Sequence, residues 1–60
     1  MLHEELEYCV KRARQEAHRA LASKRPEVAA AHRGLAIRYS ARARILRQEQ
    51  FHHRTQPETV

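Results

Sequence analysis

Apolar residues recur every three or four positions along two long segments of the chain, a spacing that matches the turn of an α-helix and not the two-residue period of a strand. The first segment is predicted to be a helix over residues 3–23. Its glutamates gather near the start, where they face the positive end of the helix dipole. The apolar stripe of this helix consists of Leu2, Leu6, Cys9, Val10, Ala13, Ala17, Ala20 and Leu21.

A turn is predicted at residues 24–26, where the apolar pattern is interrupted. Pro26 lacks a backbone donor and disfavours helical geometry at Arg25, but proline is well tolerated at the first position of a new helix. A second helix is therefore predicted over residues 26–52. Its main stripe consists of Val28, Ala31, His32, Leu35, Tyr39, Arg42 and Leu46.

Two amphipathic helices joined by so short a turn predict an all-α fold, an antiparallel two-helix hairpin that forms a single domain over residues 1–53. Residues 54–60 have no apolar periodicity and are predicted to be a disordered tail. We call the line along which the two helices contact each other the seam. At the seam, residues of the first helix are expected to pack against residues of the second: Leu6, Val10, Ala13, Ala17 and Leu21 against Val28, Leu35, Tyr39 and Leu46.

The core of such a hairpin must be thin. The chain has 60 residues, and ten of its apolar residues are alanines, which bury little area. Cys9 is the only cysteine, so an intrachain disulfide is excluded, and no Cys/His spacing indicates a structural zinc site. The missing stabilisation is expected from a second chain, in a homodimer that forms a four-helix bundle.

Gly34 indicates where a second chain could approach, because a glycine inside a helix costs about 1 kcal/mol relative to alanine. It shares a side of the helix with Ala30, Ala41 and Ile45, away from the main stripe. One hairpin partner can cover only one of these two surfaces. The predicted packing and dimer-interface residues are Leu6, Cys9, Val10, Gly34, Leu35, Tyr39, Ala41, Ile45 and Leu46.

A short signature after the proline-containing turn, in which Pro26 is followed by Ala31, His32, Leu35, Ala36 and Tyr39, resembles small uncharacterised alphaproteobacterial proteins built as a helical hairpin. The resemblance covers residues 8–42. It implies the fold class alone, since no activity is attached to such proteins.

Catalysis is not expected, and neither catalytic residues, metal ligands nor a cofactor are predicted. The chain has no aspartate, Ser23 ends a helix, and a two-helix hairpin cannot enclose a dry cavity. Cys9 is interpreted as a small buried hydrophobe. His52 and His53, with Glu49, could bind a divalent ion weakly, but favourable placement at the negative end of the helix dipole explains them more simply.

His32 lies on the main stripe and is expected at the seam. A ligand or pH-switch role is one interpretation. The favoured interpretation is a packed histidine that is hydrogen-bonded to Tyr39, to a glutamate of the first helix or to a backbone carbonyl. Arg42 is likewise expected to lie along Tyr39 and reach a glutamate of the first helix.

The formal net charge of +5, with ten arginines against two lysines, suits a polyanion or an acidic protein surface. The outer face of the second helix combines basic and apolar residues that are candidates for contacting a partner: Arg33, Ile37, Arg44, Arg47 and Phe51. A protein-interaction or adaptor hairpin that self-associates is the favoured function, and nucleic-acid binding through the arginine-rich second helix is the alternative. An acidic protein is an expected partner class, and stable membrane insertion is not expected.

The amino terminus carries glutamates and lacks the basic start and apolar run of a signal peptide, and no apolar segment has the length of a membrane span. A cytoplasmic location is therefore expected.

Overall fold

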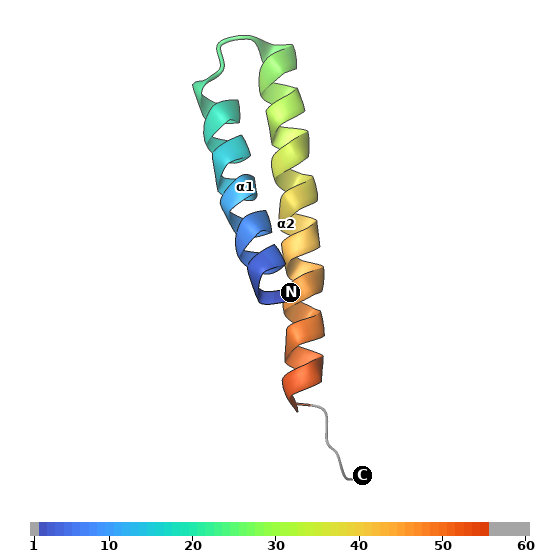
Figure 1. The fold of residues 1–60 in the computed structure, drawn as a ribbon. Coiled ribbons are helices and arrows are strands. Elements are labelled where there is room, and N and C mark those ends of the chain that lie inside the picture. Colours follow the sequence, from blue (N-terminus) through green and yellow to red (C-terminus); the bar gives the residue numbers. More distant parts are fainter. Residues whose placement is uncertain (1, 56–60) are drawn as a thin grey trace.

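The computed structural model describes the backbone of residues 2–55 and the side chains of residues 3–50. It contains two helices, α1 (Leu2–Ala22) and α2 (Pro26–Thr55), and the described residues include no strand. The helices run antiparallel and pack side by side, with α2 extending past the start of α1 (Figure 1). The predicted all-α hairpin is confirmed.

The turn between the helices occupies residues 23–25 and uses the groups expected at helix ends. The Ser23 amide donates to the Arg19 carbonyl at 3.0 Å, and the Ala29 amide donates to the Arg25 carbonyl at 2.9 Å. Pro26 therefore takes the first position of α2, where its missing donor costs nothing.

Helix α2 reaches Thr55 instead of ending at residue 52, so residues 54 and 55, predicted to begin the tail, are helical. The rest of the predicted tail, residues 56–60, lies outside the described residues.

A small hydrophobic core lies between the helices, as the alanine-rich composition predicts. Cys9, Ala43 and Leu46 form its centre, and Leu46 is fully buried. Leu6, Val10 and Tyr39 pack against this centre.

The seam differs from the prediction in the rotation of both helices about their axes. Leu21 was expected to face α2, yet it is 87% exposed, and Ala17 is exposed as well. Glu16 occupies the seam instead, with only 1% of its surface exposed. On α2, Ala36 and Ala43 turn inward while Leu35 moves to the edge, at 36% exposed.

This rotation has a physical reason: which residues are buried at the seam depends on whether polar groups find hydrogen-bond partners there, as well as on apolar area. Glu16 can be buried because partners from both helices bind both of its oxygens. Ala36 and Ala43 are buried at the seam, where their short side chains take little space. The rotation leaves part of the apolar side of α1 uncovered, and the candidate site lies there.

Candidate functional site

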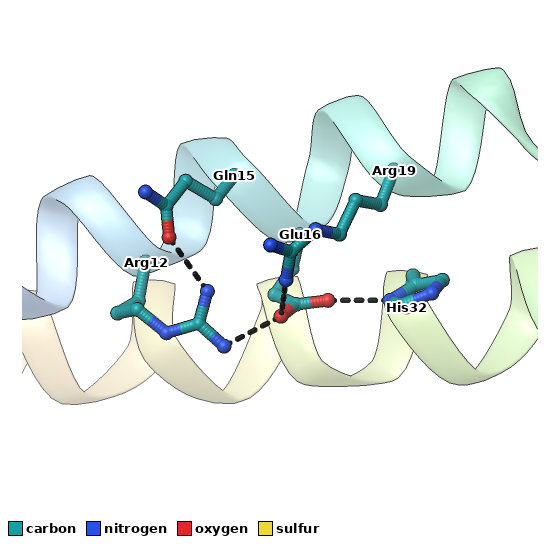
Figure 2. A network of polar contacts seen from close by, with 5 residues as sticks. All are labelled: Arg12, Gln15, Glu16, Arg19 and His32. Atoms are coloured by element: carbon teal, nitrogen blue, oxygen red, sulfur yellow. Dashed lines mark hydrogen bonds and ion pairs between the residues drawn. The ribbon is translucent and has the colours of Figure 1, made fainter.

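Glu16 lies at the centre of a polar network that ties α1 to α2 (Figure 2). One carboxylate oxygen, Oε2, accepts hydrogen bonds from Arg12 at 2.6 Å and Arg19 at 3.0 Å. The other, Oε1, lies 2.5 Å from Nδ1 of His32 on α2. The favoured interpretation of His32, a packed and hydrogen-bonded histidine, is confirmed, and of its three expected partners the structure shows the glutamate of the first helix.

These contacts keep Glu16 ionised inside the seam. The hydrogen bond from His32 lowers the pKa of Glu16 most, the hydrogen bond from Arg12 lowers it further, and together they outweigh the opposing effect of burial. The pKa of Arg12 is raised, chiefly by its hydrogen bond to Glu16. The buried negative charge is therefore compensated within the hairpin.

The same side of the hairpin carries further paired groups. The rings of Tyr8 and Tyr39 meet edge to face with centroids 6.2 Å apart, and the Arg12 guanidinium lies 5.1 Å from the Tyr39 ring centroid. Arg42 donates to Glu5 at 3.0 Å, which confirms the expected contact with a glutamate of the first helix, and this hydrogen bond raises the pKa of Arg42. We call this side, defined by Glu5, Arg12, Glu16, Tyr39 and Arg42, the paired face.

A long groove follows the seam on the other side of the hairpin. At the turn end it forms a hollow of about 530 Å³ lined by Ala17, Ala20, Leu21, Arg33, Ala36, Ile37, Ser40 and Arg44. It continues past Val10, Ala13, Arg14, Ser40, Ala43 and Arg47. It ends near Leu6, Glu7, Val10, Lys11, Arg14, Gln15 and Arg47. We call this continuous surface the groove.

The groove combines an apolar floor with cations that have no counter-ion among the described side chains. Arg14, Arg33, Arg44 and Arg47 are exposed, and none of them forms an ion pair within the described residues. Glu7 is the only acidic residue among the described ones that line the groove, and its carboxylate is 3.2 Å from His3. The paired Arg12 and Arg42 thus lie on the paired face, and the four unpaired arginines named above border the groove. Arg38 is also exposed and forms no ion pair within the described residues, but it lies outside the groove.

Most of the predicted partner-binding residues come together in this groove. Arg33, Ile37 and Arg44 line the same hollow, and Arg47 lies farther along. The side chain of Phe51, also predicted to contact a partner, lies outside the described residues.

The contribution of α1 to the groove was missed by the sequence analysis, which assigned Ala17 and Leu21 to the core and did not single out Arg14. A signal was present in the sequence. Glu16 follows Cys9 by two helical turns and has an arginine one turn away on each side, an arrangement that suits a compensated buried carboxylate.

The predicted interface residues are divided between two surfaces. Cys9 is 4% exposed and packs inside the hairpin. The predicted interface residues that pack with it are Leu6, Val10, Tyr39 and Leu46. Gly34, Ala41 and Ile45 share the side of α2 that faces away from α1, as their spacing along the helix requires. Ile45 is 47% exposed there, and a Cβ placed on Gly34 would meet nothing within 4 Å apart from its chain neighbours and the backbone of its own helix.

Within the described residues, no three side chains of the histidine, cysteine, aspartate and glutamate types are placed to hold a metal ion. Neither described helix combines the length and the apolar character that a membrane crossing requires. Comparison of the chain with protein-family models, curated proteins and solved structures finds no match. A function must therefore be inferred from the groove itself.

Proposed function

We propose that the hairpin is a non-enzymatic protein-interaction module and that the groove is its binding surface. One observation carries this proposal: the unpaired arginines Arg14, Arg33, Arg44 and Arg47 border a floor that is apolar and open. Burying Leu21 and Ile37 under a partner would remove apolar surface from water. The arginines around them would bind acidic groups of the same partner.

Nucleic-acid binding is the alternative, and the same unpaired arginines support it. A phosphate backbone, however, is bound by cations and does not need an apolar floor. Among the described residues that line the groove, none is aromatic, so none of them offers a flat surface on which a base could stack. The apolar floor therefore favours a protein partner, and we place the module in the cytoplasm, where the lone thiol of Cys9 would stay reduced.

A capture experiment from a lysate of the source cells, with and without nuclease, separates the two functions. We expect a protein partner that survives nuclease treatment and is lost from the double variant Leu21→Ser, Ile37→Ser. Ala31→Ser is the control, because Ala31 is exposed and does not line the groove. Recovery of RNA or DNA alone, lost only from the triple variant Arg33→Gln, Arg44→Gln, Arg47→Gln, would overturn this function in favour of the alternative.

Self-association is a second candidate role, supported by the exposed Ile45 and the open space at Gly34. We propose that two copies pair into a four-helix bundle through the side of α2 that carries Gly34, Ala41 and Ile45. Pairing through the groove is disfavoured, because it would bring the unpaired arginines of both copies together. The groove then stays available to a different partner.

A further inference from the structure

We propose that the groove binds an acidic amphipathic α-helix, which lies between α1 and α2 as the third helix of a bundle. This inference rests on the proposed function and names the class of partner. It is drawn from three properties of the groove: its small-residue floor, its length and the arrangement of its charges.

The floor of the groove leaves room for large side chains. Ala17, Ala20 and Ala36 present only methyl groups, and they line the hollow beside Leu21 and Ile37. A helix with leucine-sized residues along one stripe could place them over these alanines. This is how ridges of one helix pack into the grooves of others.

The length of the groove suits a helix of about four turns. Along α1 it extends from Leu6 to Leu21, a distance of about 22 Å at the usual helical rise. A helix of about 15 residues would follow it from end to end. A short loop would cover only part of this surface, and an extended strand would leave its backbone groups unpaired against side chains.

The arginines along the groove determine which residues are expected on the two flanks of the partner helix. Arg14 borders the groove from α1, while Arg33, Arg44 and Arg47 border it from α2. A partner with glutamate or aspartate on both sides of its apolar stripe would find a cation on either edge. A basic partner would be repelled, as would the groove of a second copy.

The test uses a synthetic helical peptide of about 16 residues as the probe, with leucines in one stripe and glutamates on both flanks. Binding to the intact chain is followed by fluorescence anisotropy. We expect this peptide to bind at least about tenfold more tightly than a peptide with lysine in place of glutamate, because the groove cations would repel the lysines. We expect the same margin over a peptide with serine in place of leucine, because burial of the leucine stripe is lost.

Variants of the chain locate the binding surface. Ala17→Phe fills the groove at an exposed position and should weaken binding of the leucine–glutamate peptide by about tenfold or more, since one large side chain then occupies the space of another. Ala31→Phe, an exposed alanine that does not line the groove, should leave binding unchanged. The double variant Arg33→Gln, Arg44→Gln should weaken binding several-fold and reduce its salt dependence, whereas Arg38→Gln, exposed outside the groove, should have no effect. Circular dichroism confirms that each variant is folded.

Equal binding of the leucine and serine peptides, or unchanged binding to Ala17→Phe, would overturn the helix proposal. It would also be overturned if a single-stranded oligonucleotide displaced the peptide and its own binding survived Ala17→Phe, because the groove would then act as a polyanion site. If no acidic peptide binds while a captured protein still depends on Leu21 and Ile37, the partner class is wrong and the proposed function stands. If no acidic peptide binds and no captured protein depends on Leu21 and Ile37, both the helix proposal and the proposed function fail.

Discussion

Glu16 shows how a single residue sets the geometry of this hairpin. A carboxylate at that depth is tolerated only when its charge and its hydrogen-bonding capacity are met, and Arg12, Arg19 and His32 meet them from both helices. Such an arrangement favours one rotation of α1, because any other rotation separates Glu16 from His32.

Replacing Glu16 by glutamine is expected to lower the melting temperature by several degrees at neutral pH. The amide keeps the volume but leaves Arg12 and Arg19 without an anion. The control is Glu7→Gln, which alters an exposed carboxylate and should have little effect. Thermal unfolding followed by circular dichroism measures both, and equal melting temperatures for the two variants would contradict the assigned role of Glu16.

The lowered pKa of Glu16 also predicts that the stability of the hairpin depends on pH. Because the folded-state pKa of Glu16 is lowered, the unfolded chain takes up the proton more readily. The stabilisation is therefore complete above the ordinary glutamate pKa of about 4.3 and is lost as the pH falls through the lower folded-state value. The difference in melting temperature between the wild type and Glu16→Gln should shrink below a pH of about 4, and a difference that stays constant would show that the carboxylate charge is not responsible.

At the scale of the element, the two helices differ in how many of their sides are apolar. Helix α1 has the polar network on one side of the seam and part of the groove on the other. Most of its apolar residues therefore either pack in the core or line the groove. Helix α2 has apolar residues on its seam side and also on the side of Ile45, and it extends beyond α1 at its carboxyl end (Figure 1). A helix with two apolar sides is typical of one that contacts more than one neighbour.

Gly34→Ala tests what the glycine does within α2. Gly34 has no positive φ and nothing within 4 Å of a Cβ, so alanine fits and should raise the free energy of unfolding by about 0.5–1 kcal/mol. The melting temperature of a dilute sample should rise by a few degrees. A fall would mean that another backbone approaches Gly34 closely, because only then would an added methyl group meet an obstacle.

At the scale of the whole molecule, two helices with one thin core leave two surfaces uncovered, the groove and the side of α2 that carries Gly34, Ala41 and Ile45. The first is rimmed by unpaired arginines and suits an acidic partner. The second is the surface on which we place a second copy. A small chain gains the stability that its own core cannot supply when such surfaces are covered.

Sedimentation equilibrium at micromolar concentration tests the proposed homodimer. We expect a dimer that dissociates on dilution, a melting temperature that rises with protein concentration, and a shift toward monomer in Ile45→Ser. Leu21→Ser is the matched control and should leave the dimer intact, because Leu21 lies in the groove. A folded monomer whose melting temperature is independent of concentration would contradict self-association.

The two helices, the turn before Pro26 and the small size of the core could be predicted from the sequence, because periodicity and proline act locally along the chain. The contact of Arg42 with a glutamate of the first helix could also be predicted, because it follows from antiparallel pairing. For His32, a glutamate of the first helix was one of three expected partners. Only the tertiary structure decided the rotation of each helix. Apolar area alone favoured Leu21 and Leu35 for the seam, whereas the structure buries the paired carboxylate of Glu16 together with Ala36 and Ala43. These are properties of two helices in contact, and they left Leu21 exposed beside Arg33 and Arg44, where the groove is formed.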